Sequence, residues 1–169
     1  KKIDEKSSIS PINPYAVSKT FQDLLAQNYH QIYGLNIIIS RMFTYFNARR
    51  DNLFASSFAD QIVKIENCKQ KKLRHGNLNS QRTILDIRDA MEAYYLAAVK
   101  GLPGEIYNIG GQYKATVGKI LFKLINLSKK EIETLIDKKL LRPKDIKYQV
   151  PSSSKFISQT NWKQKYVNL

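Results

Sequence analysis

Tyr15 and Lys19 are the residues whose types and spacing most clearly suggest chemistry. Residues four apart lie one turn apart on the same face of an α-helix, so the phenol and the ammonium would be neighbours. A phenol is a poor base at neutral pH because its unperturbed pKa is about 10. A fixed ammonium nearby favours the phenolate, which makes the tyrosine a usable proton acceptor or donor. The same spacing is also common as a surface pair, so the elements around it must decide between the two interpretations.

The residues around this pair predict a helix that begins at Pro14 and ends near Gly34. Asn13 can cap the first turn, and proline suits the first helical position because its missing N–H is not needed there. Apolar residues then recur at helical spacing up to the glycine, a common helix terminator. Residues 35–40 are a β-branched run typical of a buried parallel strand. A helix, a glycine turn and a buried strand indicate an α/β fold.

Further strands and a polar loop are predicted downstream. A polar and aromatic loop at residues 41–52 follows the first strand, in the position where open α/β sheets bind ligands. Residues 73–78 resemble a strand end followed by a turn, and residues 81–87 a short strand. Residues 105–109 form another predicted strand, which Gly110-Gly111 should end.

Three more helices are predicted from amphipathic spacing, beginning near Phe54, Asp86 and Thr116. Asp86 is expected to cap its helix, and Asp89 to be a surface charge on the first turn. Trp162 is expected to anchor the carboxyl-terminal tail by packing rather than to bind a ligand.

The composition is that of a globular chain, with 169 residues, 43% of them hydrophobic and 25% charged. The formal net charge of +14 suggests a polyanionic partner, but the basic residues are scattered apart from short clusters at residues 69–74 and 138–142. Nucleic-acid binding is therefore the weaker explanation. The single cysteine, Cys68, excludes an internal disulfide and fits a reducing, cytoplasmic compartment. The two histidines are isolated, no metal site is expected, and no apolar run is long enough to span a bilayer.

Six motifs in order resemble those of one enzyme family: Pro-Tyr-Ala-Val-Ser-Lys, Gly-Asn-Leu…Arg, Asp-Ile-Arg-Asp, Tyr-Asn-Ile-Gly-Gly, Arg-Pro-Lys-Asp-Ile and Asn-Trp. They resemble the carboxyl-terminal half of the extended short-chain dehydrogenases/reductases that modify nucleotide sugars. The most similar members act on the GDP-mannose route. Residues 53–62 and 85–89 are more similar to the GDP-4-keto-6-deoxy-mannose reductases, and the paired Arg49-Arg50 to the GDP-mannose 4,6-dehydratases. The balance favours the reductases slightly.

The resemblance implies a role for each matched residue. Tyr15 would exchange a proton with the sugar 4-oxygen, while Lys19 would lower the pKa of that phenol and bind the nicotinamide ribose. Nucleotide-sugar contacts would fall on Thr44, Asn77, Arg82 and Arg142. Two arginines on separate loops suit a diphosphate because guanidinium groups bind phosphate oxygens in pairs. For Asn77, turn chemistry after a glycine is an equal alternative.

Some positions depart from the family pattern. Thr44 stands where the family usually has asparagine, and Thr83 replaces the acidic residue that usually follows Arg82. Ala48 replaces a common proline, and Ser152 stands near a usual aspartate. These departures leave the predicted fold intact and weaken the assignment of a particular sugar.

The resemblance also implies a domain plan: the carboxyl-terminal part of a Rossmann-type doubly wound parallel sheet plus a small mixed α/β substrate-binding domain. Residues 1–43 would end the dinucleotide-binding domain, and residues 44–169 would form mainly the substrate domain, with residues 81–111 returning strands to the Rossmann sheet. The glycine-rich loop for NAD or NADP is absent here and is expected before residue 1, with the remaining catalytic groups. Alone, the chain is expected to be inactive. Family members also suggest a homodimer paired through the Tyr-Lys helix.

Three hypotheses follow. The first is the substrate-binding half of an NAD(P)-dependent enzyme acting on a nucleotide sugar, with a GDP-hexose favoured. The second is a truncated, non-catalytic module that binds a nucleotide sugar or a partner subunit. The third is a basic nucleic-acid-binding domain.

Overall fold

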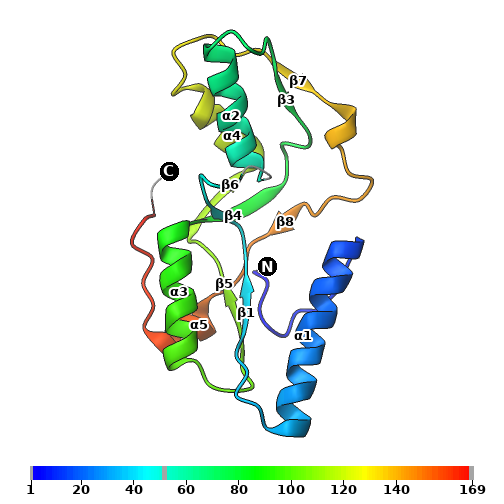
Figure 1. Ribbon diagram of the computed structural model, residues 1–169, viewed down its shortest axis with the longest axis vertical. Helices are drawn as coiled ribbons and strands as arrows, with labels where there is room; N and C mark the ends of the chain where they lie inside the picture. The colour runs from blue at the N-terminus through cyan, green and yellow to red at the C-terminus, as the bar shows by residue number, and fades with distance from the viewer. Residues whose placement is uncertain (1, 51–52, 168–169) are drawn as a thin grey trace.

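A computed structural model describes residues 2–50 and 53–167 of the chain. The described residues form helices α1 (Pro14–Tyr33), α2 (Phe54–Glu66), α3 (Ile87–Lys100), α4 (Val117–Ile125) and α5 (Ser154–Thr160), with a 3-10 turn, η1 (Lys138–Leu140). The molecule is elongated, with α2 and α4 at one end and α1, α3 and α5 towards the other (Figure 1).

The strands pair in three small sheets. Strand β1 (Ile39–Met42) lies parallel to β5 (Ile106–Ile109), and β3 (Leu73–His75) parallel to β7 (Thr134–Ile136). The third sheet is mixed and lies between the two ends of the molecule: β4 (Gln81–Asp86) pairs with β2 (Tyr45–Phe46), β6 (Tyr113–Thr116) and β8 (Tyr148–Gln149). The predicted α/β class, with parallel pairing and covering helices, is confirmed.

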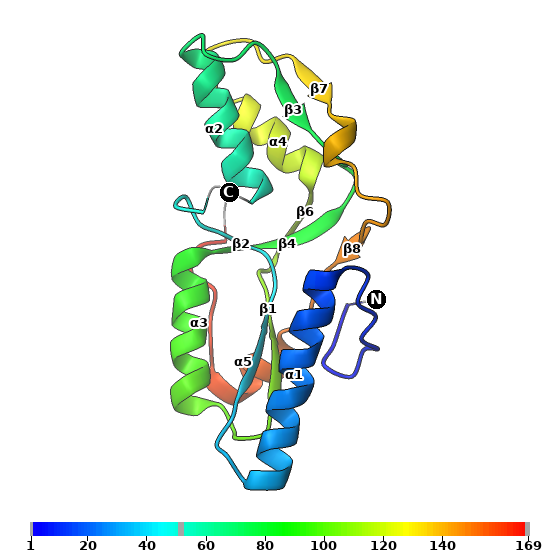
Figure 2. The same cartoon turned by 45° about the vertical axis from the view of Figure 1, so that its right-hand side comes forward.

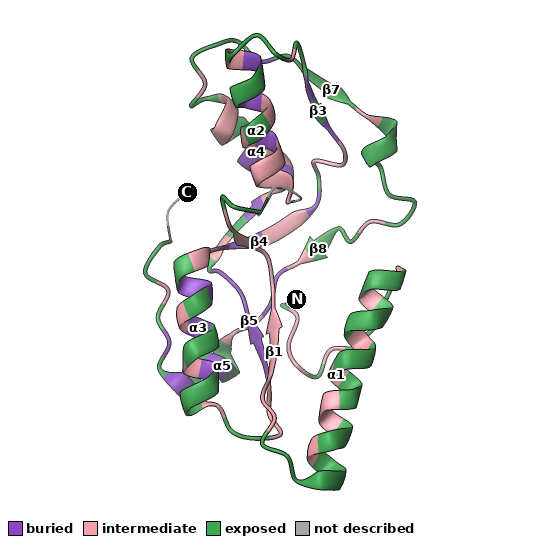
Figure 3. Cartoon of the chain, viewed as in Figure 1, coloured by how far each residue is buried: buried purple, intermediate pink, exposed green. Residues whose placement is uncertain are grey.

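Helix α1 begins and ends where the sequence predicts. The Asn13 side chain accepts a hydrogen bond from the N–H of Ala16, at 2.8 Å, and Pro14 occupies the first turn. Gly34 ends the helix in the left-handed conformation, with φ of 65°, which glycine adopts without steric cost. No residue of α1 is buried, which sets it apart from the other long helices (Figure 3).

The strand predicted at residues 35–40 is shifted. Strand β1 begins only at Ile39 and continues to Met42. The reason is that the chain must first cross from the end of α1 to the sheet. Ile37 takes part in this crossing, since its N–H donates to Leu35 and its carbonyl accepts from Gly104. The β-branched run thus provides the connection as well as the start of the strand.

Helix α3 confirms one carboxylate prediction and contradicts another. The Asp86 side chain caps the helix by accepting the N–H of Arg88, at 2.8 Å. Asp89 was predicted to be a surface charge, and this is wrong: it is completely buried. Its two oxygens accept the backbone N–H groups of Lys165 and Tyr166, each at 3.0 Å. Asp89 therefore fastens the carboxyl-terminal tail along α3.

Two hydrophobic cores stabilise the two ends of the molecule. One core lies between β1, β5, α3 and α5 and includes the buried rings of Tyr107, Phe156 and Trp162. The predicted packing role of Trp162 is confirmed, since its ring lies against Phe156 and is 2% exposed. The other core joins α2 to α4 through residues such as Ile62 and Leu121.

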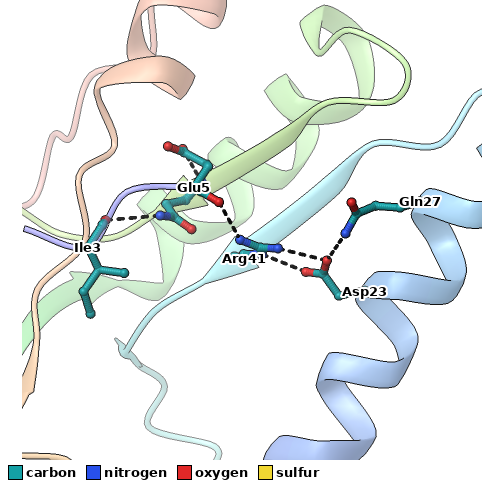
Figure 4. Close-up of polar contacts among 6 residues, drawn as sticks. Ile3, Glu5, Asp23, Gln27 and Arg41 are labelled. Atoms are coloured by element: carbon teal, nitrogen blue, oxygen red, sulfur yellow. Dashed lines mark hydrogen bonds and ion pairs between the residues drawn. The ribbon is translucent and has the colours of Figure 1, made fainter. Parts of the chain in front are cut away.

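A polar network ties α1 to the rest of the chain (Figure 4). Arg41, on β1, donates two hydrogen bonds to the carboxylate of Asp23, at 2.7 and 3.0 Å. It also donates to the carbonyl of Glu5, at 3.2 Å. Asn108, on β5, continues the network by donating its N–H to the Glu5 carboxylate and its amide to Ile3. One arginine thus connects the helix, the sheet and the amino-terminal segment.

Candidate active site

The Tyr15 and Lys19 side chains lie together at the start of α1. The Lys19 ammonium is 5.8 Å from the centre of the Tyr15 ring and donates to Gln22, at 2.9 Å. Tyr15 is 68% exposed, so its hydroxyl is accessible to a ligand. The helical spacing thus gives the neighbouring phenol and ammonium that proton transfer requires. The catalytic role itself stays a prediction.

An open cavity of about 610 Å³ places Tyr15 and Arg142 on one surface. Its lining residues come from the start of α1 and from the loop between η1 and β8: Ile12, Asn13, Pro14, Tyr15, Arg142, Pro143 and Lys144. These two segments are far apart in the sequence and adjacent in the molecule, as the two views in Figures 1 and 2 agree. Of the predicted site residues, the structure therefore brings Arg142 to the tyrosine.

Thr44 and Tyr45 follow closely on the carboxyl end of β1, which is Met42. Burial raises the pKa of Tyr94, on α3, and the nearby phenols of Tyr45 and Tyr15 raise it further. Tyr45 directly follows Thr44, whose carbonyl accepts the N–H of Leu85 at 3.2 Å. Thr44 is half-buried in this turn between two strands. Its contact with a ligand stays a prediction.

Asn77 is half-buried, and both ends of its side-chain amide are hydrogen-bonded within the protein. The amide oxygen accepts the N–H of Asn79, at 2.9 Å, which is the turn chemistry expected after a glycine. The amide nitrogen donates to the carboxylate of Asp145 at 2.7 Å, and at 3.3 Å to Ser80. This confirms the structural alternative for Asn77, while a ligand contact stays a prediction.

The guanidinium of Arg82 is likewise hydrogen-bonded within the protein. Its guanidinium donates to the carbonyls of Gln81 and Ile146, at 2.9 and 2.8 Å, and lies 3.8 Å from Asp145. The side chain is 13% exposed. Burial lowers the pKa of Arg82, an effect that Asp145 opposes and the nearby Arg142 reinforces. Arg82 therefore joins strand β4 to the loop that carries Arg142.

Asp145 also belongs to this region, although no role was predicted for it from the sequence. Its carboxylate accepts from Asn77 and from the hydroxyl of Ser80, at 2.7 and 2.8 Å. Burial alone would raise the pKa of Asp145, but these hydrogen bonds and the charge of Arg82 hold it below the ordinary value. Asp145 is part of the Arg-Pro-Lys-Asp-Ile motif, and this membership could have indicated a role for it. A function was predicted for the arginine of this motif alone.

A second cavity, of about 520 Å³, contains none of the predicted site residues. It lies between the end of β2, the start of α2 and α4, and its walls are mainly apolar, including Phe46, Leu53 and Leu124. The Tyr15 cavity is the better candidate for chemistry because it combines a phenol with two cationic side chains.

Neither a metal-binding cluster nor a membrane-spanning helix is found among the described residues. Within residues 2–50 and 53–167, no three His, Cys, Asp or Glu side chains gather in a way that could hold a metal ion. No helix in these same ranges is long and apolar enough to cross a membrane.

Comparison with known proteins identifies the family. A family model described as GDP-mannose 4,6 dehydratase matches residues 1–168. The chain belongs to the GDP-mannose 4,6 dehydratase family. This confirms the resemblance to the extended short-chain dehydrogenases/reductases that modify nucleotide sugars.

Curated relatives in this group have different named reactions. The chain is 30% identical over 168 residues to the dTDP-D-glucose 4,6-dehydratase of Mus musculus, a match that covers 96% of the chain and 46% of the relative. It is 25% identical over 163 residues to the GDP-6-deoxy-D-mannose reductase of Pseudomonas aeruginosa, covering 95% of the chain and 54% of the relative. The chain thus spans about half the length of the curated relatives it matches.

Solved structures of similar fold support the architecture. RMD from Pseudomonas aeruginosa, complexed with NADPH, matches with a TM-score of 0.85 and 24% identity, over 95% of this chain and 54% of that one. UDP-glucuronic acid 4-epimerase from Bacillus cereus, in complex with UDP-glucuronic acid and NAD, matches with a TM-score of 0.87 and 24% identity, over 98% of this chain and 52% of that one. At this identity the likeness shows the fold.

Proposed function

We propose that this chain forms the substrate-binding, carboxyl-terminal half of an NAD(P)-dependent enzyme that modifies a nucleotide sugar at C4, in the manner of a GDP-4-keto-6-deoxy-mannose reductase. The observation that carries the proposal is the shared cavity of Tyr15 and Arg142, which joins a proton-transfer group to an anion-binding group. The family match and the named reactions of the relatives support the same class of reaction.

Tyr15 and Arg142 in the cavity, and Lys19 beside Tyr15, each have a proposed task. Tyr15 donates a proton to the sugar 4-oxygen during reduction, because an alkoxide would otherwise form there. The positive charge of Lys19 favours the phenolate that remains after this transfer. Arg142 binds the diphosphate, which fixes the distance between the sugar and the tyrosine. The phenol, the ammonium and the guanidinium thereby cover the sugar and the diphosphate of one extended ligand.

The nicotinamide cofactor would supply the hydride, and the exposed Tyr15 hydroxyl and Lys19 ammonium suit the hydroxyl groups of its ribose. Both side chains lie on the accessible surface of α1 and are donors, as hydrogen bonding to ribose oxygens requires. The rest of the cofactor site, with its glycine-rich loop, is proposed to lie in a preceding half of the protein. The same half would provide the further catalytic groups.

The test is Tyr15→Phe in the full-length protein. We expect turnover of GDP-4-keto-6-deoxy-mannose to fall by about 10²–10⁴-fold, because the proton donor is lost. Binding of the nucleotide sugar, measured by calorimetry, should stay within about threefold because the ring remains. Tyr33→Phe on the same helix is the matched control and should keep full activity, since Tyr33 does not line the cavity. Near-normal turnover in the Tyr15 variant would refute the assignment.

A GDP-mannose 4,6-dehydratase is the second candidate, favoured by the description of the matching family and by the Arg49-Arg50 pair. Such an enzyme would use the same Tyr15 and Lys19 pair while C4 is oxidised, water is lost across C5 and C6, and C6 is reduced. Mass spectrometry separates the two candidates. A dehydratase converts GDP-mannose to a product lighter by one water, whereas a reductase leaves GDP-mannose unchanged and consumes the 4-keto sugar together with reduced cofactor.

We further propose that the protein forms a homodimer through α1. The apolar residues of this helix are exposed, among them Val17, Phe21, Leu24 and Ile32. Surface helices of globular proteins normally turn such residues inwards. A second copy of the helix would bury part of them, and the proposed preceding half of the protein would cover the rest.

A further inference from the structure

The cavity of about 520 Å³ opens between the end of β2, the start of α2 and the carboxyl-terminal half of α4. These elements meet where the end of the molecule formed by α2 and α4 joins the central mixed sheet, as the two views in Figures 1 and 2 agree. Among the described residues, none lines both this cavity and the Tyr15 cavity. Its volume falls within the range of about 300–1,000 Å³ that is common for small-molecule sites. The cavity is therefore a candidate site for a second ligand.

The walls of this cavity are apolar and firmly packed. On one side, Phe46 contacts Phe54 edge to face, with ring centres 5.9 Å apart, and Phe54 contacts Phe58 in the same manner at 6.1 Å. Phe58 is buried in the core that joins α2 to α4, so this row of rings fixes the wall. The other side includes Leu124 and Leu127, and Leu127 is 80% exposed. An apolar ligand would remove this surface from water, which is favourable.

The charged group and the amide that line the cavity are hydrogen-bond donors. The ammonium of Lys123 lies 5.2 Å from the centre of the Tyr113 ring, and an ammonium carries three N–H donors. The amide oxygen of Asn47 accepts the N–H of Arg49 at 2.9 Å, a contact that does not use the amide nitrogen. Among the described lining residues there is no carboxylate. The cavity therefore suits a ligand with an acceptor and a negative charge at one end.

From these walls and donors we propose that the cavity binds a monocarboxylate with an unbranched alkyl chain, of the size of a medium-chain fatty acid. The chain lies along Phe46, Leu124 and Leu127, and the carboxylate accepts hydrogen bonds from Lys123 and Asn47. One cation matches one negative charge, whereas a phosphate would bring further charge against apolar walls, which is costly. The proposal goes beyond the proposed function, since this ligand occupies a cavity that the nucleotide sugar does not use.

The first test compares Lys123→Met with Lys119→Met in the full-length protein. Both variants lose one positive charge from α4, but Lys119 is exposed one turn earlier and does not line the cavity. By calorimetry we expect Lys123→Met to raise the dissociation constant of decanoate about tenfold, because a charge-assisted hydrogen bond is lost. The dissociation constant of 1-decanol, which has the same chain without the charge, should change less than about twofold. Lys119→Met should change neither.

Equal effects of the two lysine variants on decanoate would indicate general attraction to a basic surface and would overturn the proposal. Equal effects of Lys123→Met on decanoate and on 1-decanol would also overturn it, since the carboxylate would then not contact the ammonium. A wild-type protein that does not bind decanoate at about 1 mM would refute the site altogether.

The second test fills the cavity. Ala48 lines it and is exposed, so Ala48→Trp can place an indole ring in the cavity without replacing a buried side chain. We expect the binding of decanoate and of 1-decanol to weaken by more than about tenfold. Gln112→Trp adds the same ring at an exposed position outside the cavity and should leave both dissociation constants unchanged. If Ala48→Trp binds decanoate as the wild type does, the ligand lies elsewhere and the proposal is wrong.

Discussion

At the scale of single residues, Arg142 is the proposed anion-binding group, and it lines the same cavity as Tyr15. We predict that Arg142→Ala raises the dissociation constant of the nucleotide sugar by about 10- to 100-fold, because charge-assisted hydrogen bonds contribute about 1.5–3 kcal/mol. Calorimetry with GDP-mannose measures the change. Arg74→Ala is the control, since Arg74 is an exposed arginine on β3, outside the cavity. An unchanged dissociation constant for Arg142→Ala would remove its binding role.

Asp145 is predicted to stabilise the fold as well as the loop. Asp145→Ala leaves the side chains of Asn77 and Ser80 without their shared acceptor and should lower the free energy of unfolding by about 1–3 kcal/mol at pH 7. Because the folded-state pKa of Asp145 is lowered, this stabilisation is present above the ordinary carboxyl pKa of about 3.9 and is lost as the pH falls through the folded-state value. Urea unfolding at pH 7 and pH 3 measures both effects. The account would be contradicted if the free energies of unfolding of wild type and variant differed by the same amount at pH 7 and at pH 3.

The roles of side chains whose hydrogen-bond partners are close in the sequence were predictable. The roles of side chains whose partners are distant in the sequence were not. Asn13 and Asp86 cap helices within three residues of their own positions, so their roles follow from local spacing. Asp89 and Asp145 look like ordinary surface carboxylates in the sequence. Their partners lie 76 and 77, and 65 and 68, residues away, where periodicity carries no information.

At the scale of secondary-structure elements, α1 is attached by its polar side. Asp23, whose side chain is 11% exposed, and Arg41 hold the helix against β1, while its apolar residues face outwards. A two-point arginine–carboxylate contact fixes orientation as well as distance. The positions of Tyr15 and Lys19 therefore depend on an ion pair that lies about two turns beyond Tyr15 and about one turn beyond Lys19 on the same helix.

We predict that Asp23→Asn loosens α1 without unfolding the sheet. Hydrogen exchange of the amides in α1 should become about tenfold faster or more, while exchange in β5 should change little. The Arg41 contact lowers the pKa of Asp23, so in the wild type the stabilisation is present above a pH of about 4 and disappears as the pH falls below the ordinary carboxyl range. Gln27→Leu removes the other hydrogen bond to Asp23 and serves as the control with retained charge. Uniformly faster exchange throughout the chain would contradict a local role.

Helix ends were predicted more accurately than strand ends. The first and last residues of a helix are marked by caps such as Thr116 and Gly34, which act within one turn. A strand begins where a partner strand is available, and for β1 that partner is β5, at Ile106. The sequence of residues 35–40 favours an extended chain but contains nothing about the position of β5. The short strands β2, β6 and β8 were missed for the same reason.

At the scale of the whole molecule, the exposed apolar side of α1 predicts self-association. Phe21 is 63% exposed, and Phe21→Glu places a charge in the proposed dimer contact. We expect the variant to be monomeric at concentrations where the wild type is dimeric, as measured by analytical ultracentrifugation. Met91→Glu, on an exposed apolar position of α3, is the matched control and should remain dimeric. A monomeric wild-type protein would refute the dimer.

The backbone of Ile3 pairs with two residues close to the other end of the chain. Its N–H donates to Val150 at 2.8 Å, and its carbonyl accepts from Ser152 at 2.7 Å. This pairing closes a loop that contains most of the sequence, and such closures slow folding because the entropy of the loop is lost before the contact forms. During synthesis, the amino-terminal segment must therefore wait unpaired until residue 152 has left the ribosome. The pairing of Ile3 with residues 150–152 is thus predicted to form late among the contacts of these residues, and the apolar side chains of α1 need protection from aggregation during that interval.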